Sequence, residues 1–120
     1  MPKKIDRFIL RPRLRVEKGN EIALGPGKIE LLEHIALTGS IAEAAAQMEM
    51  SYMRAWTLVK TMEACFRRPL VEAHRGGSSQ GGARLTVVGR KALSLYRRMH
   101  RDCQKATKPA WRELRKLLKP

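Results

Sequence analysis

Residues 40–63 contain the pattern that most restricts the fold of this chain. The segment has an alanine-rich stretch that begins at Ser40, a two-residue break, and a second helical stretch that begins at Ser51. Ser40 and Glu43 have the spacing of a capping box, and Ser51 is a second residue suited to cap a helix. The small alanine side chains let the second helix approach the first closely. This arrangement predicts a helix-turn-helix, in which one helix supports the next.

The apolar spacing divides both helices into inner and outer faces. We expect the turn to be Glu49-Met50, with Met50 inserted in the core. The inward positions follow helical spacing: Ile41, Ala44, Ala45, Met48, Ala55, Val59 and Met62. The outward positions of the second helix are Tyr52, Met53, Arg54, Thr57, Lys60 and Thr61. Trp56 is interpreted as a packing residue rather than a base contact. No acidic residue occurs between Ser51 and Met62, so this outer face suits a phosphate-lined groove.

Patterns on both sides of this motif predict the remaining elements. Alternation over 11–18, the turn Gly19-Asn20 and a strand over 21–24 predict a β-hairpin. A helix is expected over 28–38, with an apolar stripe of Ile29, Leu32, Ile35 and Ala36 and a C-terminal cap at Gly39. Short strands at 70–73 and 83–85, joined by a glycine-rich loop, predict a two-stranded wing. That loop lacks the phosphate-binding patterns GxxxxGK[ST] and GxGxxG.

The C-terminal region predicts a long helix and then a short one. Thr86 is expected to cap the long helix. Thr107-Lys108-Pro109 is interpreted as the cap and first turn of a separate final helix. In that final helix Trp111, Leu114, Leu117 and Leu118 face one way. The long helix carries an apolar strip with four- and three-residue steps: Val88, Ala92, Leu95, Met99, Cys103 and Ala106.

A small winged domain does not need the whole of this apolar strip for its own core. We therefore interpret part of it as a homodimer contact, centred on Leu95, Met99 and Cys103; the alternative is docking on the same chain. The fold class is then mainly α with a small β wing, a winged helix-turn-helix with a long C-terminal dimerisation helix. We divide the chain into a basic N-terminal arm and hairpin (1–25), the winged helix-turn-helix (26–86) and the dimerisation helices (87–120).

The charge of the chain indicates its partner. There are 25 Lys and Arg against 11 Asp and Glu, a formal net charge of +14. An excess of that size favours a polyanion. Together with the motif it indicates double-stranded DNA, with phosphate contacts setting the register and base contacts setting the specificity. We expect the contacts to come from Lys28, Ser40, Ser51, Tyr52, Met53, Arg54, Thr57, Lys60, Arg75 and Arg84.

Other classes of function receive less support from the residues. Cys65 and Cys103 lack CxxC spacing and are expected to be free, buried thiols on separate helices, and the three histidines have no metal-ligand spacing with them. We expect no metal, no cofactor and no catalytic residues, so the chain is not expected to be an enzyme. No apolar run is long enough to span a membrane, and no secretory signal is recognised at the N-terminus, which favours a cytoplasmic, nucleoid location.

Residues 28–89 resemble the N-terminal DNA-binding domain of ModE-type molybdate-responsive transcription regulators, which are related in fold to the LysR-type winged helix-turn-helix. The matching stretches are Leu32, HIALTGSI at 34–41, Ala44-Ala45, SYMRAW at 51–56 with Val59 and Met62, and GGARLTVVG at 81–89. The resemblance implies a dimer that inserts one recognition helix per half-site into a palindromic operator. It makes residues 51–60 the recognition helix and 74–84 the wing. Members of the family continue into molybdate-binding domains, whereas this sequence ends at Pro120, so we expect no molybdate binding in this chain.

Two other functions remain as alternatives. The first is non-specific nucleic-acid binding driven by charge, as in a nucleoid-associated or RNA-binding basic protein. The second is a protein-interaction module that uses the winged fold without DNA. The uncharged body of the recognition helix disfavours the first, and the basic excess disfavours the second.

Overall fold

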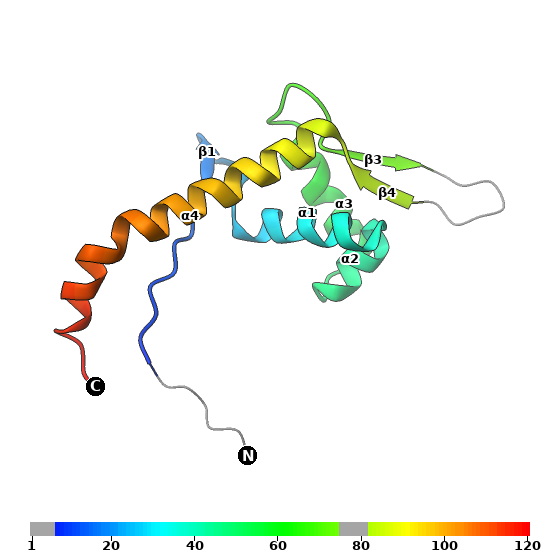
Figure 1. Ribbon diagram of the computed structural model, residues 1–120. Helices are drawn as coiled ribbons and strands as arrows, with labels where there is room; N and C mark the ends of the chain where they lie inside the picture. Colours follow the sequence, from blue (N-terminus) through cyan, green and yellow to red (C-terminus); the bar gives the residue numbers. More distant parts are fainter. Residues whose placement is uncertain (1–6, 75–81) are drawn as a thin grey trace, which may run out of the picture.

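The computed structural model describes residues 7–74 and 82–120 of the chain (Figure 1). Over these ranges the helices are α1 (Pro26–Thr38), α2 (Ile41–Gln47), α3 (Tyr52–Glu63) and α4 (Val87–Arg115). The strands are β1 (Val16–Lys18), β2 (Glu21–Leu24), β3 (Val71–His74) and β4 (Gly82–Leu85). β1 pairs with β2, and β3 pairs with β4, each as an antiparallel hairpin. The predicted winged helix-turn-helix with a long C-terminal helix is confirmed.

The helix boundaries agree with the capping residues of the sequence. α1 begins two residues earlier than expected because Pro26 has the fixed φ that suits the first helical position. It ends at Gly39, whose φ of 70° lies in the left-handed region that glycine adopts readily. Ser40 and Ser51 cap α2 and α3, each accepting a hydrogen bond of 3.1 Å from a backbone N–H three residues on. Thr86 caps α4 in the same way.

The core lies between α1, α2 and α3, with contributions from the wing strands and the first half of α4. Its largest fully buried side chains are Leu31, Leu32, Ile35, Val59, Met62 and Leu70. The inward positions predicted for α2 and α3 are confirmed, with Met48 and Met50 half-buried against the core. The stripe predicted for α1 was wrong at one position. Ala36, which was expected to be covered, is exposed, and Leu31 is buried although it lies outside the predicted stripe.

The wing is tied to the helical core through its base. The Ala83 N–H donates to the Gly39 carbonyl at 2.9 Å, which joins β4 to the turn before α2. The Thr86 N–H donates to the Leu70 carbonyl at 2.9 Å. The Glu63 carboxylate, at the end of α3, accepts from the backbone N–H groups of Leu70 and Val71 at 2.7 and 2.9 Å. These bonds fix the direction in which the hairpin leaves the core.

The first strand is shorter than the alternation of residues 11–18 predicted. β1 has three residues, all exposed, and Val16 is 44% exposed. The preceding segment packs along α4 instead: the Tyr96 hydroxyl donates to the Leu14 carbonyl at 2.8 Å, and Leu14 is half-buried. Burial raises the pKa of Tyr96, with a smaller opposing effect of Arg13. Because the backbone of Leu14 bonds to a side chain of α4, it is not used for pairing with another strand.

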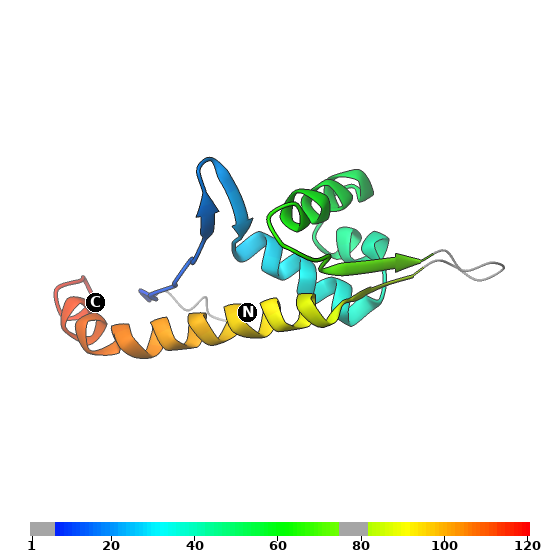
Figure 2. The same cartoon turned by 90° about the horizontal axis from the view of Figure 1, so that it is seen from above.

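The expectation of two C-terminal helices was wrong. α4 continues to Arg115 with Pro109 inside it. Thr107 is not an N-cap; its hydroxyl donates back to the carbonyls of Cys103 and Gln104 at 2.8 and 3.3 Å. The proline has no N–H for the carbonyl four residues earlier, which bends a helix without ending it when the other bonds remain. Figure 1 and Figure 2 both show the last part of α4 bending toward the side of the N-terminal segment.

Both cysteines are free, as expected, but neither is buried. Cys65 is exposed in the turn after α3, and Cys103 is half-buried on α4. Since α3 ends at Glu63, Cys65 lies outside the helix on which it was expected.

Candidate nucleic-acid interface

The outer face of α3 is exposed along its first two turns. Tyr52 and Met53 are 50% and 65% exposed, and Arg54 and Thr57 are also exposed. These four residues form what we call the α3 reading face. Two adjacent exposed apolar side chains beside an arginine give this face both apolar and charged groups for contact with a partner.

A groove of about 470 Å³ lies between this helix and the wing. One wall comes from the start of α2 and from α3, and the other comes from the base of the β3–β4 hairpin. The lining residues are Ser40, Ile41, Ala42, Tyr52, Trp56, Ala73, His74, Gly82 and Ala83. The structure therefore brings Ser40 and Tyr52, two of the predicted DNA contacts, to one concave surface with the wing. In Figure 1 and Figure 2 the wing projects from the end of the molecule that holds α2 and α3.

The two capping serines keep a donor for a ligand. The Oγ atoms of Ser40 and Ser51 accept from the N–H groups of Glu43 and Arg54. A hydroxyl that accepts a hydrogen bond can still donate one, and a phosphate oxygen is an acceptor. Both serines can thus cap their helices and bind phosphate at the same time.

The basic side chain of Lys60 is already engaged within α3. Its Nζ lies 4.3 Å from the centroid of the Trp56 ring and 3.6 Å from Glu63 Oε1. Trp56 is half-buried against the core, in agreement with its interpretation as a packing residue, and its exposed edge lines the groove. The sequence indicated the acid-free face, but it did not indicate that Glu63 reaches back toward Lys60.

The wing arginine Arg84 is paired with an acid that was not predicted. Arg84 Nε donates to Glu72 Oε2 at 3.0 Å across the hairpin. The register Glu72↔Arg84 places the two residues opposite each other, a pairing that an antiparallel alignment of the two predicted strands would have indicated. Both side chains are more than half exposed, so the ion pair is weak. Arg84 could therefore leave Glu72 and bind a phosphate instead. Arg75, the other predicted wing contact, lies outside the described residues.

Lys28 lies apart from the other predicted contacts. Its Nζ donates to the Ile22 carbonyl, and it lines a small hollow with Glu21, Thr61 and Ala64 near the end of α3. The structure therefore places it against the β1–β2 hairpin, whereas the groove lies at the start of α3. Lys28 and Ile22 are six residues apart in the sequence, and no general rule predicts a hydrogen bond at that spacing. The sequence alone therefore could not indicate this contact.

The apolar strip predicted from Val88 to Ala106, which we call the α4 strip, is divided between the core and the surface. Val88 and Ala92 pack against the core, whereas Leu95 and Met99 are each 45% exposed, and Cys103 is half-buried. The buried positions of α4 lie on an adjacent face at Gly89, Leu93 and Tyr96. An Arg97–Glu33 ion pair also holds α4 on α1. The part of the strip beyond Ala92 is thus available to a partner.

Two other features bear on the class of site. Among residues 7–74 and 82–120, no group of three or more histidine, cysteine or acidic side chains could hold a metal ion. Within the same ranges, no helix has the length and apolar character needed to cross a membrane.

The three-helix core followed by a β-hairpin and a long helix defines a winged helix-turn-helix protein. Residues 27–90 match the family described as bacterial regulatory helix-turn-helix protein, lysR family, and the chain belongs to that family. The chain is 38% identical over 100 residues to the molybdenum transport protein ModE of Azotobacter vinelandii, covering 83% of this chain and 36% of that protein. It is 41% identical over 81 residues to the DNA-binding transcriptional dual regulator ModE of Escherichia coli K12, covering 68% and 31%.

These matches confirm the resemblance to ModE-type regulators. The chain spans only about a third of the length of these relatives, at 36% and 31%. Among solved structures, the DNA-binding domain of CbnR in a DNA complex superimposes with a TM-score of 0.57 at 21% identity, covering 74% of this chain and 97% of that one. That structural similarity supports the winged helix-turn-helix fold.

Proposed function

We propose that this chain is the sequence-specific DNA-binding part of a dimeric transcription regulator. The observation that carries the proposal is the α3 reading face, which is exposed, free of acids from Ser51 to Met62, and flanked by a groove leading to the wing. α3 lies in the major groove of DNA, where Tyr52, Met53, Arg54 and Thr57 meet base edges. The names of the ModE relatives and the DNA complex of CbnR support the same function. It implies a location at nucleoid DNA in the cytoplasm.

The roles of the basic residues follow from their surroundings. Arg54 reaches DNA from the first turn of α3, and Ser40 and Ser51 donate to phosphates. Arg84 exchanges Glu72 for phosphate, and Lys60 supplies positive charge from above Trp56. Arg75 is a proposed wing contact on sequence grounds. Lys28 contributes to the field around DNA rather than to the groove, because its ammonium group is bonded to the hairpin.

Selection of bound fragments from a random duplex library, followed by affinity measurements, tests this function. We expect one recovered sequence to outcompete random duplex, since base contacts add to the phosphate term. With about 6–10 phosphate contacts per dimer, the affinity is expected to fall roughly 10³–10⁵-fold between 50 and 200 mM salt. A steep salt dependence without any sequence preference would instead support the charge-driven alternative. Lack of binding at low salt would contradict both.

Arg54→Ala tests the reading face in the same experiment. The variant is expected to lose about 1–3 kcal/mol of discrimination at one base position of the recovered sequence. Arg98→Ala is the matched control, because it removes the same charge from an exposed position on α4. If Arg54→Ala weakens binding more than the control but leaves base preference unchanged, Arg54 is a phosphate contact only; an equal loss in both variants would show that Arg54 acts only through its charge.

In this proposal the dimer contact lies on the exposed part of the α4 strip. We expect Met99→Glu to convert the protein to a monomer, because two introduced carboxylates would face each other or apolar side chains at the interface. Met99 is 45% exposed in the single chain, so the variant's fold remains intact. Ser94→Glu, also on the surface of α4, is the control and is expected to leave the dimer unchanged. Light scattering with size-exclusion chromatography distinguishes the two; a dimeric Met99→Glu protein would place the interface elsewhere.

A further inference from the structure

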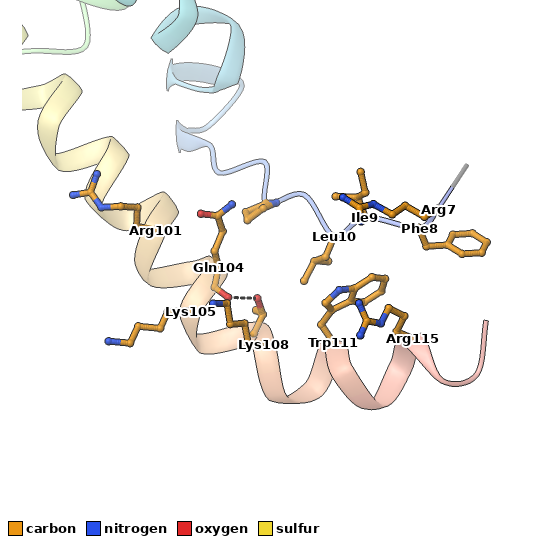
Figure 3. Close-up of a pocket in the computed structure, with 12 residues that line it drawn as sticks. Arg7, Phe8, Ile9, Leu10, Arg101, Gln104, Lys105, Lys108, Trp111 and Arg115 are labelled. Carbon is orange, nitrogen blue, oxygen red and sulfur yellow. Dashed lines mark hydrogen bonds between the residues drawn. The ribbon is translucent and has the colours of Figure 1, made fainter. Parts of the chain in front are cut away.

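A second concave surface lies far from the reading face, where the N-terminal segment passes the bent end of α4. This groove has a volume of about 720 Å³ (Figure 3). The lining residues are Arg7, Phe8, Ile9, Leu10, Pro12, Arg101, Gln104, Lys105, Thr107, Lys108, Trp111 and Arg115. We refer to it as the arm groove. It lies near the C-terminal end of α4, whereas the wing projects from the opposite end of the molecule (Figure 1).

The arm groove is strongly and uniformly positive. Two arginines and two lysines of α4 line it together with Arg7, and none of the described residues lining it is acidic. Four basic side chains outside the groove have acidic partners in the described residues, in the pairs Lys60–Glu63, Arg84–Glu72, Arg97–Glu33 and Lys116–Glu113. Over residues 7–74 and 82–120, no ion pair joins an acid to any of the five groove cations. The positive field in the groove is thus not neutralised by these residues and attracts an anion.

The same groove has an apolar wall. It is formed by three consecutive apolar residues, Phe8, Ile9 and Leu10, which are 55%, 56% and 41% exposed. Figure 3 shows Leu10 facing the indole of Trp111, with Arg115 beside that ring. A half-buried indole with a guanidinium at its edge is a surface on which an aromatic ring can stack, with its charged substituents held by the cations.

The bend in α4 produces this concavity. Pro109 lacks the N–H that would bond the Lys105 carbonyl, and Thr107 turns its hydroxyl onto the carbonyls of Cys103 and Gln104. The last turns of α4 therefore lean toward residues 7–12, which brings Trp111 opposite Leu10 (Figure 2, Figure 3). A straight helix would carry Trp111 away from the arm. The groove is part of the fold and does not depend on a side-chain rotamer alone.

We propose that the arm groove binds a small aromatic anion with two or more negative charges, a class to which nucleoside phosphates belong. The ring stacks on Trp111 between Leu10 and Arg115, and the charged groups contact Lys108 and the neighbouring cations. A bound molecule joins the N-terminal segment to the end of α4. The site is separate from the reading face, so the proposal does not rest on the proposed DNA-binding function.

Isothermal titration calorimetry of the full chain with three probes tests the proposal. ATP supplies both ring and charge, inorganic tripolyphosphate supplies charge alone, and adenosine supplies the ring alone. ATP is expected to bind at least about tenfold more tightly than either of the others, because stacking and charge pairing both contribute. In a Trp56→Phe background, which leaves Trp111 as the single tryptophan, ATP is expected to quench the fluorescence. Equal binding of ATP and tripolyphosphate, or no binding of ATP, would overturn the proposal.

Variants then locate the site. Trp111→Leu and the double variant Lys108→Gln/Arg115→Gln are each expected to weaken ATP binding about tenfold or more. The matched control Lys91→Gln/Arg98→Gln removes one lysine and one arginine from exposed positions of α4 outside the groove, and it is expected to bind ATP like the unaltered chain. Circular dichroism checks that all variants fold. Equal losses in the groove and control variants would show that ATP binds the basic surface in general, which also overturns the proposal.

Discussion

Gly89→Ala is expected to lower the free energy of unfolding by about 3 kcal/mol or more, at the upper end of overpacking effects. A Cβ built on Gly89 would lie 2.1 Å from the Leu70 carbonyl oxygen and 3.0 Å from its carbonyl carbon. Those atoms belong to the backbone and cannot move aside as a flexible side chain would. The Leu70 carbonyl also accepts the Thr86 N–H, so displacing it disrupts the base of the wing as well.

A thermal melt followed by circular dichroism measures this effect. A loss of that size corresponds to a decrease in Tm of about 10 °C or more for a domain of this length. Gly27→Ala is the matched control, since Gly27 also lies in the first turn of a helix but its Cβ would have nothing within 4 Å. We expect the control to be neutral or stabilising by about 0.5–1 kcal/mol, the helix preference of alanine over glycine. Similar melts for both variants would show that α4 can separate from Leu70 without loss.

The close contact at Gly89 also explains how the wing and α4 are oriented. β3 begins immediately after Leu70, and only Thr86 separates the end of β4 from the start of α4. Near these two junctions, the backbone of α4 at Gly89 lies directly against the backbone of Leu70. The reading face and the α4 strip are thereby held in a fixed relation. In the proposed dimer, this relation sets the spacing between the two copies of α3.

Local signals in the sequence predicted the helix-turn-helix well. Ser40, Ser51, Thr86 and Gly39 mark helix ends through bonds that span three or four residues, and such bonds depend little on the rest of the fold. The alternation of buried and exposed positions in α3 also followed from spacing alone. For the same reason, the α3 reading face could be predicted before its surroundings were known.

The errors arose where tertiary contacts outweighed a local rule. Pro109 was expected to start a new helix, but the helix continues through it with a bend. Residues 11–15 alternate like a strand, yet Leu14 bonds to Tyr96 of α4. The spacing of the α4 strip indicated one apolar face, whereas the most buried positions of α4, including Leu93, lie on the face beside it. In each case the structure is determined by a contact with a distant segment of the chain, and the neighbouring residues in the sequence do not show which segment that is.

Glu63 is a further residue whose role only the tertiary structure reveals. It ends α3, its side chain is 12% exposed, and its carboxylate accepts the N–H groups of Leu70 and Val71. From the sequence it is simply the first acid after the acid-free stretch. In the structure it joins the C-terminal end of α3 to the first wing strand.

Glu63→Ala is expected to lower the free energy of unfolding by about 2–4 kcal/mol, because two partly buried N–H groups lose a charged acceptor. Glu63→Gln retains an oxygen that can accept, so we expect it to lose only about half as much. Glu113→Gln is the control: Glu113 is 71% exposed in its pair with Lys116, and an exposed pair contributes about 0–1 kcal/mol. Urea denaturation gives the stabilities, and amide hydrogen exchange at Leu70 and Val71 gives the local effect. Unchanged protection of those two amides in Glu63→Ala would show that the carboxylate does not hold the wing, whatever the change in global stability.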